Sequence, residues 1–84
     1  MKTIQQMREL RASLPQGKKD PWGECCPSKR ILLGRALKKN DLRELTVGEF
    51  AVVQEWLEFT RKIKRETEIA VSQMEKTIAK LTQP

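Results

Sequence analysis

Residues 46–81 constrain the fold more than any other part of this 84-residue chain. At their start, Thr46 and Glu49 have the spacing of a capping box, in which each side chain accepts a hydrogen bond from the other residue's backbone amide. No Pro or Gly follows Gly48 until Pro84. The pattern predicts one continuous helix, which at about 1.5 Å per residue would be about 54 Å long. Because a compact chain of this length is only about 30 Å across, we expect part of this helix to project as an arm.

The apolar positions divide this helix into two parts. Residues 50–63 carry two adjacent apolar stripes, which are formed by Phe50, Val53 and Leu57 and by Val52, Trp56, Phe59 and Ile63. Two stripes imply burial over a wide face, so we expect this part to be the core element on which the first two helices pack. Residues 71–81 carry one narrow stripe, formed by Val71, Met74, Ile78 and Leu81, with the spacing of a two-helix contact.

The narrow stripe has two interpretations. As part of a projecting arm it would bind a protein partner or form a homodimer through residues 64–81, parallel or antiparallel, with Lys64 at a seam position that sets the register. Alternatively, a bend at Thr60 or Thr67 would let the stripe pack on the rest of the chain. We favour the arm, because no helix-breaking residue is present. The predicted partner-binding residues are Trp22, Val71, Met74, Ile78 and Leu81.

The first half of the chain predicts two shorter helices and a loop. Residues 3–14 and 28–39 have helical apolar spacing, and the Pro- and Gly-containing segment 15–27 between them has none. Residues 41–45 make at most one further turn. We therefore expect an all-α fold: one small helical domain over residues 1–84, with a three-helix head and the long helix as its arm.

Composition limits the setting of the protein. Apolar residues make up 38% of the chain and charged residues 33%, as in a soluble helical protein. The longest apolar run is four residues, at 50–53, which is far too short for a membrane span or a signal peptide. We expect a cytoplasmic protein without membrane contact.

The net charge of +6 lies entirely in residues 1–45, which hold eleven Lys and Arg against five Asp and Glu. Such an excess favours an acidic partner, and nucleic acid is the alternative to a protein. The candidate phosphate-binding residues are Lys18, Lys19, Lys29, Arg30, Arg35, Lys38, Lys39 and Arg43. Cations are also favoured at helix C-termini, which accounts for part of this set, and no aromatic residues alternate with the charges to stack on bases.

No pattern for catalysis or metal binding is present. The chain has no histidine, no Gly-rich phosphate loop and no nucleophile motif. Cys25 and Cys26 are adjacent, with Cα atoms about 3.8 Å apart, which is shorter than disulfide geometry requires. We expect no enzyme activity, cofactor or metal site.

The resulting hypothesis is a non-enzymatic binding protein. It would regulate or inhibit a larger protein or nucleoprotein complex through the long helix and the loop at residues 15–27, where Trp22 would either cover the core or anchor the interface. The alternative is a dimeric, basic, nucleic-acid-binding regulator.

Overall fold

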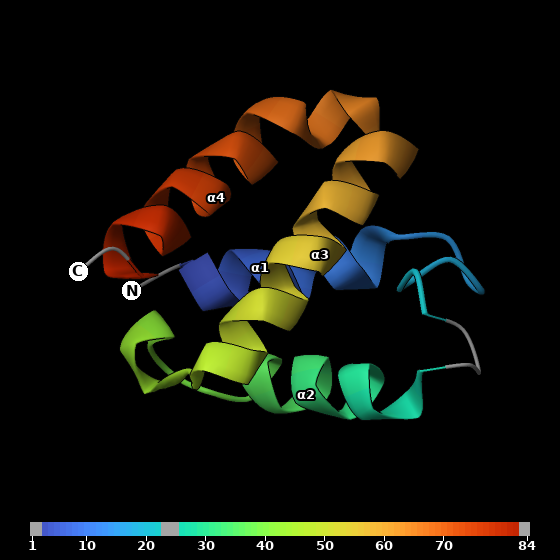
Figure 1. Cartoon of the computed structure of the whole chain (residues 1–84). Helices are drawn as coiled ribbons and strands as arrows, with labels where there is room; N and C mark the ends of the chain where they lie inside the picture. Colours follow the sequence, from blue (N-terminus) through green and yellow to red (C-terminus); the bar gives the residue numbers. More distant parts are fainter. Residues whose placement is uncertain (1–2, 23–25, 83–84) are drawn as a thin grey trace.

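The computed structural model describes residues 3–22 and 26–82, which fold into four α-helices and two short 3₁₀ turns (Figure 1). In chain order these are α1 (Thr3–Ser13), α2 (Pro27–Leu37), η1 (Leu42–Glu44), α3 (Val47–Ile63), η2 (Arg65–Thr67) and α4 (Glu68–Thr82). No strand occurs in the described part of the chain. The predicted all-α fold is confirmed, and η2 and α4 together form a long C-terminal helix.

Local sequence signals explain where α3 and η1 begin. The Thr46 side chain accepts from the Glu49 amide at 3.2 Å, and Glu49 accepts from the Thr46 amide at 3.1 Å, as the capping-box spacing predicts. A second capping box joins Asp41 and Glu44 around η1. Helix α2 begins at Pro27, one residue before the predicted range of 28–39, because proline suits the first helical position, where no amide donor is needed.

The loop after α1 contains a turn that requires glycine. The Lys18 amide donates to the Pro15 carbonyl at 3.0 Å, and Gly17, in the third position of this turn, has a φ of 86°. Side chains rarely adopt that left-handed conformation, so glycine is the natural residue there. This turn changes the direction of the chain just after the end of α1.

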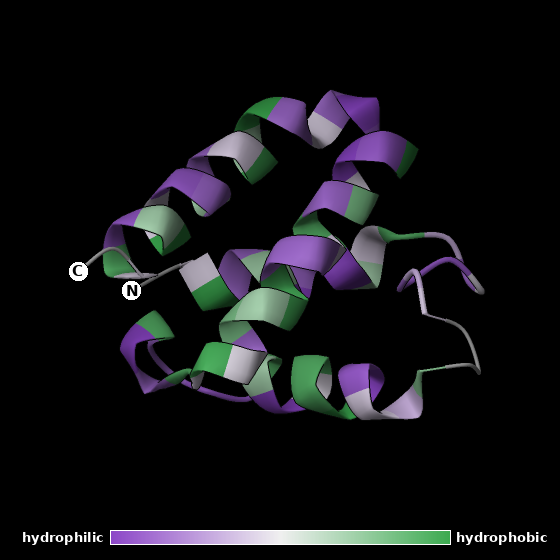
Figure 2. Cartoon of the chain, viewed as in Figure 1, coloured by the Kyte–Doolittle hydropathy of each residue, from purple (hydrophilic) through white to green (hydrophobic). Residues whose placement is uncertain are grey.

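Helix α3 is central to the core. It packs against α2 and α4, and α1 packs against α2. Val52, Val53, Trp56 and Leu57 are all buried, and Phe50 and Phe59 pack at the edges of the same core. Burial over this wide face confirms that residues 50–63 form the core element, but its neighbours are α2 and α4 rather than the first two helices. Figure 2 shows the matching alternation of apolar and hydrophilic positions along α3 and α4.

The chain does not continue as one helix from residue 46 to residue 81, and that prediction is wrong. Lys64 leaves the helical conformation, with φ −117° and ψ 83°, and α4 runs back along α3 (Figure 1). The molecule is only 34 Å in its longest dimension, so no arm of the predicted length projects from it. The break lies within residues 60–67, where the alternative interpretation had placed a bend.

Burial of the narrow stripe explains the reversal. Interrupting a helix sacrifices a few backbone hydrogen bonds, each worth about 0.5–1.5 kcal/mol net. Burying a large apolar side chain gains about 1.5–3 kcal/mol, and the reversal buries three: Val71, Met74 and Ile78. Arg61 and Glu75, 3.5 Å apart, add an ion pair between α3 and α4 at the surface, where such pairs contribute little.

Candidate functional site

The predicted partner-binding stripe lies inside the chain's own core. Val71 and Ile78 have no exposed surface and Met74 is 5% exposed, while Leu81 is half-buried against the same cluster. A projecting arm would leave the stripe in water unless an outside partner covered it. Helix α3 provides that cover within the chain, so in this structure the stripe offers no free binding surface.

Trp22 covers the edge of the core rather than standing out as an anchor. It is 6% exposed, and its amide donates to the Asp20 side chain at 3.2 Å. The indole Nε1 of Trp56, buried beneath, donates to the Lys19 carbonyl at 2.8 Å and ties the loop to α3. A shallow pocket lies beside Trp22 and is lined by Pro21, Trp22, Glu55, Glu58, Phe59 and Lys62.

The predicted basic residues do not form one patch. Lys29 pairs with Glu55 at 3.1 Å, toward α3. Arg35 is exposed on α2 and Arg43 on η1, and Lys18 is exposed in the loop. Lys19, Arg30 and Lys38, in contrast, line surface hollows alongside α1 and α2.

A groove between α1 and α2 brings four cationic side chains together. It encloses about 440 Å³ and is lined by Arg8, Arg11, Ala12, Lys19, Gly34, Leu37 and Lys38. A second hollow of about 320 Å³ shares Arg11 with it and is also lined by Pro27, Arg30 and Ile31. We call these two hollows together the basic groove. No carboxylate lines it among the described residues.

Two of the groove cations are fixed by backbone carbonyls. Arg8 Nη2 donates to the Lys39 carbonyl at 3.2 Å, just beyond the end of α2. Lys19 Nζ donates to the Arg11 carbonyl at 3.0 Å, in the last turn of α1. Carbonyls at a helix C-terminus attract cations, so these contacts position both side chains without neutralising their charge.

Arg30 is the groove cation with an acidic neighbour. Its Nε lies 3.5 Å from Asp20 Oδ2, and Asp20 is largely buried. Arg8, Arg11, Lys19 and Lys38 form no ion pair with any carboxylate in the described part of the chain. Their charge is therefore available to an external anion.

The groove floor is open at Gly34. A Cβ built on this residue would meet no atom within 4 Å, although Gly34 lies in the interior of α2. Glycine in a helix interior costs about 0.5–1 kcal/mol relative to alanine. Packing within the chain therefore does not explain the glycine.

Sequence reasoning missed Arg8 and Arg11. They belong to α1, whose apolar positions were the signal that we used, and the candidate set was drawn only from residues 18–43. The spacing of three places Arg8 and Arg11 on the same side of a helix, and that signal could have added them. Only the packing of α1 on α2 shows that they face Lys38 across a groove.

The other candidate sites, at the cysteines and the carboxylates, provide no grouped set of functional side chains among the described residues. Cys26 is a half-buried free thiol, and Cys25 lies outside the described residues. Over residues 3–22 and 26–82, no group of three or more Cys, Asp or Glu side chains could hold a metal ion. Ile31, an apolar position of the predicted helix at residues 28–39, is 56% exposed and lines the basic groove.

Within the described residues, no helix combines the length and the apolar character needed to cross a membrane. Comparison of the chain with protein-family models, with curated proteins and with solved structures gave no match.

Proposed function

We propose that this chain is a non-enzymatic protein that binds the phosphate backbone of nucleic acid through the basic groove. The observation that carries the proposal is the groove lining. Arg8 and Arg11 of α1, Lys19 of the loop and Lys38 at the C-terminal end of α2 line one hollow, and no carboxylate is in its lining. Guanidinium groups suit phosphate because their planar fork can donate two parallel hydrogen bonds.

The groove supports backbone contact rather than the reading of bases. Its lining holds no aromatic side chain on which bases could stack. Its apolar side chains are Ala12, Leu37, Ile31 and Pro27, none of which is aromatic. We therefore expect binding with little sequence preference, as is usual for contacts dominated by phosphate.

Such binding would give the protein a regulatory role. A small protein that occupies the backbone of a nucleic acid, or the nucleic-acid surface of a nucleoprotein complex, competes with other proteins for the same phosphates. The proposal thus keeps the predicted class of regulator or inhibitor, but it moves the binding surface from the C-terminal helix and loop to the basic groove. An acidic protein partner is the competing outcome, and the experiment below separates the two.

Neutralising two groove cations tests the proposal. Arg11→Gln combined with Lys38→Gln should weaken binding to a labelled 20-nucleotide single strand or 20-base-pair duplex by about tenfold or more at about 50 mM salt. On duplex DNA, the slope of log affinity against log salt should fall by about 1.8, since two phosphate contacts are lost. Fluorescence anisotropy at several salt concentrations gives both quantities.

Lys76→Gln combined with Lys80→Gln provides the matched control, because both lysines are exposed on α4 and the change in net charge is the same. This control should bind almost as tightly as the wild type. If both double variants weakened nucleic-acid binding equally, net charge alone would drive binding, and the groove would not be the binding site. Binding to an acidic polypeptide but to no nucleic acid at about 50 mM salt would replace the proposal with a protein partner.

Gly34 gives an independent test that separates stability from binding. Gly34→Ala should raise the free energy of unfolding by about 0.5–1 kcal/mol, because the new methyl group meets no atom and alanine favours the helix. Gly34→Glu should instead place a carboxylate in the groove and weaken nucleic-acid binding. Urea unfolding and anisotropy measure the two effects, and unimpaired binding by Gly34→Glu would show that the ligand does not enter this part of the groove.

A further inference from the structure

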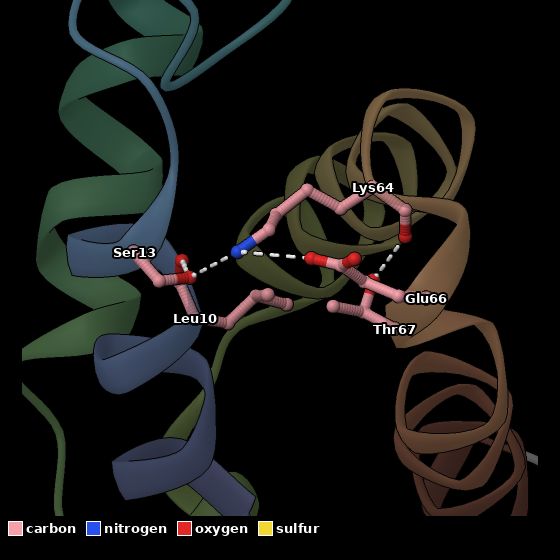
Figure 3. Close-up of polar contacts among 5 residues, drawn as sticks. All are labelled: Leu10, Ser13, Lys64, Glu66 and Thr67. Carbon is pink, nitrogen blue, oxygen red and sulfur yellow. Dashed lines mark hydrogen bonds and ion pairs between the residues drawn. The ribbon is translucent and has the colours of Figure 1, made fainter.

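The reversal between α3 and α4 depends on one residue outside the helical conformation. Lys64 has φ −117° and ψ 83°, yet its amide still donates to the Thr60 carbonyl at 2.8 Å. The Thr67 amide and hydroxyl both donate to the Lys64 carbonyl, at 2.9 Å and 2.6 Å (Figure 3). The hinge is thus very short, and helical hydrogen bonding resumes at once on either side of it.

The Lys64 side chain ties the hinge to α1. Its Nζ lies 3.2 Å from Ser13 Oγ and 3.8 Å from a Glu66 carboxylate oxygen, and the Ser13 hydroxyl donates to the Leu10 carbonyl (Figure 3). These are contacts at or near the surface, where single polar interactions are weak. The hinge contacts alone therefore do not enforce the reversal.

The hinge sequence is equally suited to a straight helix. No Pro or Gly lies between Gly48 and Pro84. Glu58 and Lys62 already form an i,i+4 pair at 3.7 Å in α3. If the chain straightened, Lys62 with Glu66 and Lys64 with Glu68 would add two more such pairs. Packing of α4, and not local preference, selects the bent form.

We propose that two copies of this chain exchange α4 and form a domain-swapped dimer. Each chain would straighten at Lys64 into one helix over residues 47–82, and its α4 would pack on α3 of the other copy. The buried stripe of Val71, Met74 and Ile78 requires a surface of matching shape, and a second copy presents the identical site. Every core contact of the monomer is regained, and only the hinge contacts change.

The dimer goes beyond the proposed nucleic-acid binding and does not depend on it. The basic groove is built from α1, α2 and the loop between them, with no residue of α4 in its lining. Exchange of α4 therefore leaves each basic groove intact, and the dimer carries two such grooves. Short hinge loops favour such an exchange.

Arg65→Pro tests the exchange. Arg65 is exposed and is the first residue of η2, a position that tolerates proline because its amide has no acceptor within the helix. Lys64 before it already lies outside the helical region that a following proline disfavours. In a straight helix, however, proline at position 65 would be interior and would break the chain's hydrogen bonding. Arg65→Ala is the matched control, because it removes the same side chain without restricting the backbone.

Refolding from denaturant at about 1 mM and at about 10 µM, followed by size-exclusion chromatography with light scattering, gives the outcome. Wild type and Arg65→Ala should yield a species of twice the mass of one chain, in a fraction that rises with protein concentration during refolding and decays slowly after dilution. Arg65→Pro should remain monomeric at both concentrations, with a native circular dichroism spectrum. If Arg65→Pro fails to fold, Arg65→Gly replaces it, because glycine also disfavours the straight helix.

Two results would overturn the exchange. Equal dimer fractions for Arg65→Pro and Arg65→Ala would show that copies associate through their surfaces without straightening. If neither the wild type nor Arg65→Ala formed a dimer after refolding at about 1 mM, the chain would not adopt the straight helix that the exchange requires.

Discussion

Met74→Glu combined with Ile78→Glu is expected to unfold the whole chain. Met74 is 5% exposed and Ile78 has no exposed surface, and both lie in the core cluster that α3 shares with α4. Each substitution forfeits about 1.5–3 kcal/mol of apolar burial and forces a carboxylate into an apolar site. A domain of this size has only about 3–5 kcal/mol of stability in total, so the double variant should lose its folded state.

Ala70→Glu combined with Gln73→Glu is the control, since both residues are exposed on the same helix and the added negative charge is the same. This control should keep a native far-ultraviolet circular dichroism spectrum and a cooperative urea transition, and the core variant should show neither. A core variant that stays folded with unchanged stability would favour a projecting arm and contradict the packing of α4 on α3.

Trp56→Ala should be the most damaging single substitution to alanine. Trp56 has no exposed surface, and its indole donates to the Lys19 carbonyl at 2.8 Å, which connects the loop to α3. Truncating a buried tryptophan costs about 3–5 kcal/mol, which equals the whole stability expected of so small a domain. We therefore expect most of the variant to be unfolded at 25 °C.

Trp56→Phe separates packing from the hydrogen bond. Phenylalanine keeps much of the apolar volume but leaves the Lys19 carbonyl without its indole donor, so we expect a smaller loss of about 1–3 kcal/mol. Gln54→Ala, on the exposed side of α3, should change stability by no more than about 0.5 kcal/mol. Urea unfolding of the three variants checks this order, and a native melting temperature for Trp56→Ala would show that the core does not depend on this residue.

Local sequence signals determined the helices themselves. The capping residues Thr46 and Glu49 fixed the start of α3, and the wide apolar face around Trp56 fixed its place in the core. The absence of helix in residues 15–22 followed from their Pro and Gly residues, and Pro27, the predicted end of the loop, begins α2. These features could be read in advance because they depend on neighbours within about four positions along the chain.

The basic groove was only partly visible in the sequence. The concentration of positive charge in residues 1–45 was clear, and Lys19, Arg30 and Lys38 belonged to the candidate set. The sequence did not show that Arg8 and Arg11 lie near Lys38, because these residues are far apart in sequence and come together only when α1 packs on α2. Packing likewise directed Lys29 toward Glu55.

The sequence by itself predicted helix on both sides of Lys64, although as one continuous helix over residues 46–81, and it determined which stripe of α4 is apolar. Only the tertiary structure decided that the helix reverses at Lys64 and that Val71, Met74 and Ile78 face the chain's own core. The local preference of residues 58–68 is helical throughout, and the hydrogen bonds lost at a break are worth little. Burial of three large apolar side chains contributes more, but that gain depends on whether α3 offers a matching surface. Such a surface exists only after the rest of the chain has folded, so no local pattern could reveal it.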